Sequence, residues 1–144
     1  MANKTIKYRY IDSQYGYTLD IIFTDNIKRI VTNIYNKWGV EEEVYDCSGC
    51  TLICISPDNV RDITKYALVF RYDQLGINLI AHECQYLSAF ILTDRAIGLP
   101  GENNDFENMC WLTGHLNQMV WDIVVKEQLE FVDIPLPIKL TKLG

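Results

Sequence analysis

The sequence predicts a single α+β domain in which a small mixed or antiparallel sheet packs against three helices. Two segments near the start have the alternating, β-branched and aromatic composition of strands. Three later segments repeat apolar residues at helical spacing, and two short apolar runs separate the first of these from the other two. The resulting order, β-β-α-β-β-α-α, favours an α+β arrangement. No repeat, low-complexity segment or linker divides the chain, so we expect one domain over residues 1–144.

The first two strands are expected to form a hairpin. They correspond to KTIKYRYID at residues 4–12 and YGYTLDIIF at residues 15–23. The residues SQYG, at positions 13–16, have the composition of a tight turn. An antiparallel pair therefore begins the domain.

A change from strand to helical period follows at residues 24–39, TDNIKRIVTNIYNKWG. The apolar residues at helical spacing are Ile27, Ile30, Val31, Ile34 and Trp38. Thr24 or Asp25 is expected to cap the N-terminus, and Gly39 suits a left-handed C-terminal position. We expect an amphipathic helix that packs along one face.

Two strands and two long helices complete the predicted domain. The apolar run TLICIS, at residues 51–56, is expected to be a buried strand that ends at Pro57, and KYALVFRYD, at residues 65–73, is a second strand. Helical spacing starts near Leu75 and continues to the sequence GLPGEN. The last helix is expected over residues 105–126.

Residues 131–144, FVDIPLPIKLTKLG, predict an extended C-terminal arm. Two prolines within an alternating apolar stretch disfavour a helix. Such an arm covers the edge of its own sheet or lies along a neighbouring subunit by strand addition. The residues expected to make these interface contacts are Phe131, Val132, Ile134, Leu136, Ile138 and Leu140.

Composition excludes several classes of function. Hydrophobic residues make up 49% of the chain and charged residues 22%, which is typical of a globular domain. The formal net charge is -6 and no basic run is present, so we expect no direct nucleic-acid binding. The apolar runs are too short for a membrane helix, and the N-terminal segment lacks the apolar core of a signal peptide. We therefore expect synthesis in a cytoplasm and no membrane contact.

The five cysteines are expected to be reduced, because an odd number at irregular spacing does not suit a disulfide framework. Cys47 and Cys50 have the C-x-x-C spacing of a zinc knuckle or a redox pair. A structural zinc site needs a second such pair or two histidines downstream, and a redox motif normally opens a helix. Reduced loop thiols are the preferred interpretation, and Cys54, Cys84 and Cys110 are expected to be packing residues.

The pair His82-Glu83 begins the pattern H-E-x-x-H, but Tyr86 stands where the second histidine belongs. In that pattern two histidines one helical turn apart bind the same Zn²⁺, and the glutamate acts as general base on the metal-bound water. A third ligand comes from elsewhere. The other histidine, His115, lies about 12 Å along the last helix from Glu107 and is badly placed to substitute.

The segment from Ile77 to Val120 resembles a small zincin-like family encoded by tailed bacteriophages and related mobile elements. In that family H-E-x-x-H is followed by a short loop that ends in glycine and by a helix that begins E-x-x-A-Y-L-x-G-x-L. The matching residues here are His82, Glu83, Gly98, Glu107, Cys110, Trp111, Leu112, Gly114 and Leu116. The resemblance covers about a third of the chain and implies a zincin-like fold.

Tyr86 is the main departure from that family. Tyrosine is a poor zinc ligand near neutral pH because its ordinary pKa is about 10. His82 and Glu107 would remain as ligands, fewer than the three of a catalytic zinc site. We expect no bound metal or other cofactor, and a near-core Tyr86 whose hydroxyl hydrogen-bonds His82 or Glu107. Glu107 also has a local explanation as part of a capping box with Asn104.

The function that the resemblance and the arm imply is that of a non-catalytic structural protein of a tailed-phage virion, in the connector, ring or tail region. Its expected partners are other virion proteins and copies of itself, and its expected location is the virion, after synthesis in the host cytoplasm. The alternative is a phage-encoded zinc metallopeptidase-like hydrolase with an incomplete metal site. In that alternative Glu83 is the general base, and His82 and Glu107 bind the zinc.

Overall fold

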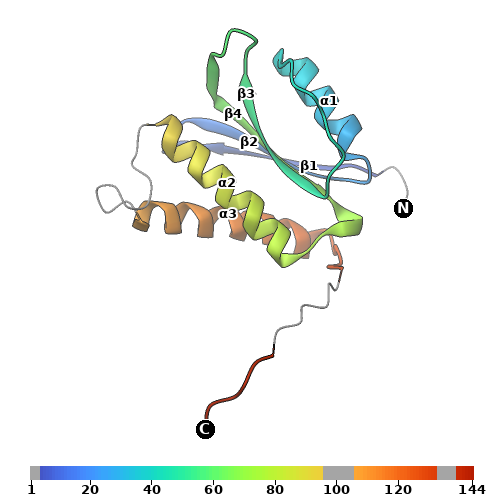
Figure 1. Ribbon diagram of the computed structural model, residues 1–144, viewed down its shortest axis with the longest axis vertical. Helices are drawn as coiled ribbons and strands as arrows, with labels where there is room; N and C mark the ends of the chain where they lie inside the picture. The colour runs from blue at the N-terminus through green and yellow to red at the C-terminus, as the bar shows by residue number, and fades with distance from the viewer. Residues whose placement is uncertain (1–3, 96–105, 133–138) are drawn as a thin grey trace.

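The computed structural model describes residues 4–95, 106–132 and 139–144, without the side chain of Phe106. The fold is α+β, and its elements follow the order that the sequence predicts, with one added 3₁₀ turn (Figure 1). The strands are β1 (Ile6–Asp12), β2 (Tyr17–Thr24), β3 (Gly49–Ile55) and β4 (Arg61–Arg71). The helices are α1 (Ile27–Trp38), the 3₁₀ turn η1 (Tyr72–Gln74), α2 (Ile77–Asp94) and α3 (Phe106–Lys126).

The four strands form one mixed sheet in the order β1-β2-β4-β3. β1 and β2 make the predicted antiparallel hairpin, and β3 is antiparallel to β4. The two central strands, β2 and β4, are parallel, with Ile21 opposite Leu68. Parallel neighbours need a crossover connection. Here that connection is α1 followed by β3.

Helices cover both faces of the sheet: α1 lies on one face, and α2 and α3 lie on the other (Figure 1). The α1 side buries Ile22, Ala67 and Val69 beneath the helix. Alternate residues of the same strands, such as Ile21 and Leu68, belong to the larger core beneath α2 and α3. Each central strand is therefore apolar on both faces, as parallel strands usually are.

The hairpin turn forms as the sequence predicts. Gly16 has a φ of +71°, a left-handed conformation that glycine adopts without strain. The Asp12 carboxylate accepts hydrogen bonds from the Tyr10 hydroxyl and the Tyr15 amide. The Gly16 amide also donates to the Asp12 carbonyl, at 3.1 Å. Asp12 thus organises both ends of the turn.

The N-cap of α1 is Asn26, so the prediction of Thr24 or Asp25 was wrong. The Asn26 side chain accepts a hydrogen bond from the Arg29 amide at 3.1 Å. Thr24 is still the last residue of β2, and its hydroxyl accepts from the Asn26 amide instead. At the other end, the prediction for Gly39 is confirmed, with a φ of +73°.

β3 is an edge strand and only half-buried, which corrects the expectation of a buried strand. Its residues are apolar because α1 covers one face and α2 covers the other. α2 approaches β3 closely at Gly49, where an added Cβ would lie 3.0 Å from Cδ1 of Leu79. The absence of a side chain at this position lets α2 lie against the strand.

α2 and α3 pack against each other in antiparallel directions (Figure 1). Their middle parts are joined by the Thr113 hydroxyl, which donates to Ser88 Oγ at 2.8 Å. Beyond the end of α3, the amide of Val132 donates to the carbonyl of Leu75, just before α2. No helix in the described ranges is both long and apolar enough to cross a membrane.

The predicted interface residues of the C-terminal arm divide into three groups. Phe131 packs edge-on against Trp121, with ring centroids 4.9 Å apart. Val132 forms the backbone hydrogen bond to Leu75. Leu140 is 91% exposed in a segment without regular structure. The remaining predicted contact residues, Ile134, Leu136 and Ile138, lie outside the described residues.

Replacement of Leu68 by Ala tests whether β4 is the centre of the core. Leu68 is fully buried, so we expect Leu68→Ala to lower the free energy of unfolding by about 2–5 kcal/mol. Ile11→Ala is the matched control on exposed β1, with an expected change within about 0.5 kcal/mol. Urea unfolding followed by tryptophan fluorescence measures both. Equal losses in the two variants would contradict this account of the core.

Candidate functional site around Glu83

Glu83 lies on the inner side of α2 and points toward β3. It is only 7% exposed. The Thr51 hydroxyl lies 3.0 Å from Glu83 Oε1 and 3.0 Å from the Glu83 backbone carbonyl, and donates to these acceptors. Because β3 approaches α2 at Gly49, the carboxylate is enclosed between the strand and the helix.

His82 lies on the outer side of the same helix. Its side chain is 62% exposed, and Nε2 lies 3.8 Å from Oε2 of Glu83. The His82 ring also contacts the edge of the Tyr86 ring, with centroids 4.8 Å apart. His82 and Tyr86 therefore occupy one exposed face one turn apart, while Glu83 occupies the neighbouring buried face.

Tyr86 is 51% exposed, so the prediction of a core or near-core aromatic was wrong. The buried face of α2 consists of Ile80, Glu83, Cys84, Leu87, Ser88, Ile91 and Leu92. Position 86 lies outside that face. Its ring meets the His82 ring in a T-shaped contact, and not through the hydrogen bond from its hydroxyl that was predicted.

Glu107 lies in the first turn of α3, far along the helix pair from His82. The Ser88–Thr113 hydrogen bond marks where the helices touch. From that point His82 is about 9 Å toward the start of α2, and Glu107 is about 9 Å toward the start of α3. Because the helices are antiparallel, these directions are opposite, and the two side chains are roughly 15 Å or more apart.

The structure therefore does not bring the two proposed zinc ligands together. Within residues 4–95, 107–132 and 139–144, no group of three or more His, Cys, Asp or Glu side chains is placed to hold a metal ion. His115 does not join either residue; its ring packs against Tyr10, with centroids 5.6 Å apart. Asn104, the predicted capping partner of Glu107, lies outside the described residues.

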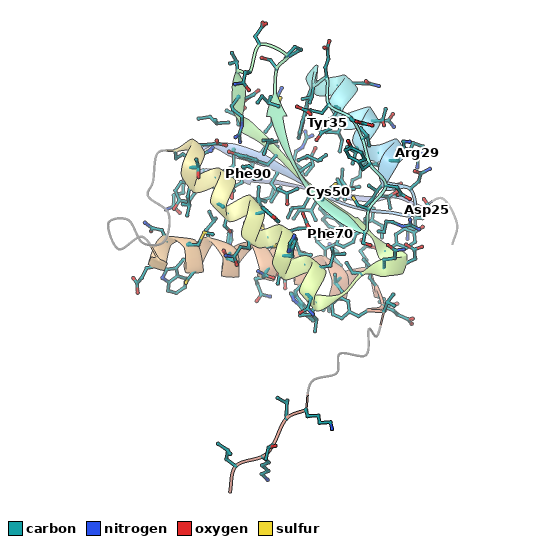
Figure 2. The ribbon with its side chains drawn as sticks, in the orientation of Figure 1. Asp25, Arg29, Tyr35, Cys50, Phe70 and Phe90 are labelled. Atoms are coloured by element: carbon teal, nitrogen blue, oxygen red, sulfur yellow. The ribbon has the colours of Figure 1, made fainter. Side chains whose placement is uncertain are left out.

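Three cysteine thiols have raised pKa values to which the charge of Glu83 contributes, although Cys47 and Cys50 lie on the α1 side of the sheet. Burial raises the pKa of Cys84 to about 12, and the charge of Glu83 adds to the shift. Burial also raises the pKa of Cys50 and of Cys47. Cys47 lies in the loop as predicted, but Cys50 belongs to β3, so the prediction of a loop thiol was wrong there. Cys50 lies with Tyr35 in the region between α1 and the sheet (Figure 2). A thiol with a raised pKa is protonated near neutral pH and is a poor nucleophile or metal ligand.

Glu83 stabilises the contact between α2 and β3. A general base has to reach the proton that it removes, directly or through one water molecule. The Glu83 carboxylate is instead enclosed and bonded to Thr51. Its other oxygen, Oε2, lies 3.8 Å from Nε2 of the exposed His82 ring.

A second polar cluster, at the end of α2, was not predicted from the sequence. The Asp94 carboxylate accepts hydrogen bonds from Arg61 and from the hydroxyl of Tyr66, both on β4. Arg95 donates to the Tyr66 hydroxyl at 2.8 Å, and its guanidinium lies over the Tyr17 ring, 5.4 Å from the centroid. Burial, then the bond to Asp94, raises the pKa of Tyr66, so the hydroxyl remains a donor.

This cluster ties the end of α2 to the sheet and to the hairpin. Arg95 also donates to the backbone carbonyls of Tyr15, at 3.0 Å, and Ile63, at 2.7 Å. The partners lie far apart in the sequence, so no local motif signals them. The one local hint is a basic residue at a helix C-terminus, which is favourable for the helix dipole.

No protein family, curated protein or solved structure matches this chain.

The Asp94 cluster is testable by stability. Asp94→Ala leaves Arg61 and Tyr66 without their shared acceptor, and we expect the free energy of unfolding to fall by about 2–4 kcal/mol. Asp20→Ala is the matched control, because Asp20 pairs with Arg9 on the surface, where such pairs contribute about 0–1 kcal/mol. Urea titrations of both variants provide the comparison. A loss of unfolding free energy in Asp94→Ala no larger than in Asp20→Ala would contradict a stabilising role for the Asp94 cluster.

Thiol accessibility provides a further prediction. Cys110 is exposed on α3, so its prediction as a packing residue was wrong. Cys54 and Cys84 are buried as predicted, and Cys47 and Cys50 are half-buried. We expect N-ethylmaleimide to label one thiol rapidly near neutral pH, and Cys110→Ser to remove that fast reaction. Intact-mass spectrometry counts the labels, and protein unfolded in urea serves as the control, with all five cysteines labelled. Rapid labelling of several thiols in the folded protein would contradict the burial described here.

Proposed function

We propose that the protein is a non-catalytic, zincin-like structural component of a tailed-phage virion, in the connector, ring or tail region. It works through contacts with other virion proteins and with copies of itself. The zincin-like character and the phage source rest on the resemblance around His82-Glu83 and on the later motif residues from Glu107 to Leu116. The structural role rests on the exposed surfaces of α3, α2 and the C-terminal segment.

The observation that carries the proposal is the exposed aromatic residue Trp111 on α3. Its side chain is 77% exposed. It lines a surface hollow together with Glu107, Cys110, Gly114, His115 and Gln118. Exposed tryptophans beside such hollows are typical of protein–protein interfaces. The contact surface that we propose on α3 therefore includes residues that carry the family resemblance.

The α2 helix supports the same interpretation. Its exposed face carries Tyr86 and His82 beside a hollow that Met109 of α3 also lines. Glu83, the one residue of the motif suited to act as a base, is directed away from that surface and bonded to Thr51. An exposed aromatic face over an enclosed carboxylate suits binding rather than catalysis.

The C-terminal segment adds a second contact region. Leu140 and Leu143 are both almost fully exposed. A partner that covers these exposed leucines removes apolar surface from water, which stabilises the complex. Lys139 and Lys142 flank these positions and are exposed. These lysines make the segment accessible to chemical cross-linking.

The alternative of a zinc hydrolase gains no specific support. It requires His82 and Glu107 to share a metal ion with Glu83 as general base. The first two lie at opposite sides of the Ser88–Thr113 contact, and the third is enclosed.

Cross-linking of assembled particles tests the structural role. Purified particles of a phage whose genome encodes this protein are treated with an amine-reactive cross-linker and analysed by mass spectrometry. We expect the protein among the particle proteins, with cross-links from Lys139 or Lys142 to another protein or a second copy. Lys28, on the exposed side of α1, is the reference site within the same chain. Absence of the protein from particles would refute the proposal.

Metal content separates the proposal from its alternative. We expect purified protein to contain far less than one zinc per chain by elemental analysis, with no change in His82→Ala or Glu107→Gln. Stoichiometric zinc that both substitutions remove would favour the hydrolase.

A further inference from the structure

A basic groove lies on the side of the sheet that α1 covers only partly. It has a volume of about 520 Å³ and runs between α1 and the strands β1 and β2. Its charged lining consists of Lys7, Arg9, Lys37, Lys65 and the single acid Asp20. Four cations and one anion give a local charge of +3, in a chain whose formal net charge is -6.

The groove follows from the size of one helix. A helix is about 10 Å across and neighbouring strands are about 4.8 Å apart, so a single helix covers about two strands. α1 packs on β3 and β4. The outward-facing residues of β1 and the start of β2 are left open, among them Lys7, Arg9, Thr18 and Asp20.

The cations in the groove are only partly neutralised. Arg9 makes a two-point contact with Asp20, at 2.7 and 3.0 Å, and Lys65 lies 3.5 Å from Asp62. Among the residues that the structure describes, neither Lys7 nor Lys37 forms an ion pair. These two lysines lie on opposite walls, one on β1 and the other on α1.

The floor of the groove is apolar. Ile22, Ile30, Ile34 and Trp38 contribute to its lining beneath the charged rim. Ile34 and Trp38 are only half-buried by the protein itself. A ligand that fits both features has carboxylates for the rim and an apolar side chain for the floor.

The loop after α1 has this chemistry. Residues 41–46 read EEEVYD, and Glu41, Glu42 and Glu43 are all exposed. Tyr45 is 69% exposed and donates a hydrogen bond to Glu43 at 2.8 Å. The loop therefore presents three carboxylates and an aromatic ring to solvent. Its last acid, Asp46, is engaged with Arg71 of the same chain.

The acidic loop and the groove lie on different sides of α1. Tyr35 faces β3, where Cys50 and Glu42 contribute, after burial, to the raised pKa of its hydroxyl (Figure 2). Lys37, on the other side of the helix, faces the groove. Val44 holds the loop against the core on the β3 side. One molecule thus keeps its loop away from its own groove, while the groove of a second molecule remains accessible.

We infer that copies of this chain associate head to tail, with the acidic loop 41–46 of one copy seated in the basic groove of the next. The carboxylates of Glu41 and Glu42 pair with Lys7 and Lys37, and Tyr45 covers the apolar floor. Such a contact joins two different surfaces, so it repeats into a ring or a filament. The inference deepens the proposed function by naming how copies meet, and it rests on that proposal for its biological setting.

Charge reversal tests the contact directly. The groove variant is Lys7→Glu/Lys37→Glu, and the loop variant is Glu41→Lys/Glu42→Lys. We expect each variant alone to associate at least about tenfold more weakly than the unmodified protein, because opposed charges become like charges. We expect an equimolar mixture of the two variants to regain association, since each then meets a complementary surface. Sedimentation velocity over a concentration series measures these changes.

The matched control is Lys28→Glu/Arg29→Glu, which changes the net charge equally on the exposed side of α1 (Figure 2). It should associate like the unmodified protein, and circular dichroism should show that all variants fold. Raised salt should weaken association of the unmodified protein, because it screens exposed charges.

Three results of the association experiments would overturn the inference. These are a monomeric unmodified protein at every concentration, association that neither reversal weakens, and variants that do not recover on mixing. Binding of inorganic phosphate or a single-stranded oligonucleotide that Lys7→Glu/Lys37→Glu abolishes, without any effect on association, would also overturn it. The protein could still be found in particles in each case, so the proposed function is tested separately.

Discussion

The parallel pairing of β2 with β4 is the constraint on which the rest of the structure depends. Both strands lie inside the sheet, and both present apolar residues to each face, as Ile21, Ile22, Leu68 and Val69 do. An apolar strand that is exposed on one face loses the stabilisation that burial supplies. Helices must therefore cover both faces. The crossover that makes the strands parallel also delivers α1 to the first face, and the chain after β4 supplies α2 and α3 to the second.

The two candidate surfaces follow from how completely these helices cover the sheet. Two helices cover one face, so the side chain of Glu83 is enclosed against Thr51 and the outer residues, such as Trp111, face solvent. A single helix covers the other face, so part of the sheet stays open and a basic groove forms beside α1. The same enclosure explains why Glu83, which suggests a general base in the sequence, is part of a helix–strand contact in the fold, while its neighbour His82 faces solvent.

Much of the architecture was predictable because local patterns determine it. Ile27, Ile30 and Val31 are buried at helical spacing, and Gly39 ends α1 in the left-handed conformation. The hairpin turn is equally local. Predictions that depended on contacts between separate elements failed. Asn26 became the cap because β2 extends to Thr24, and Tyr86 is exposed because α3 packs on another face of α2. The Asp94 cluster was missed because its partners come from distant segments.

The sequence by itself determined the order and type of the elements, since strand and helix periods depend on residues a few positions apart. It also determined that His82 and Tyr86 share a helix face. Only the tertiary structure decided that β2 and β4 are parallel neighbours and that His82 and Glu107 lie apart. It likewise gathered Lys7, Arg9, Lys37 and Lys65 from separate elements into one groove, although the chain has no basic run. Distances between segments depend on how the whole core packs, and no local pattern contains that information.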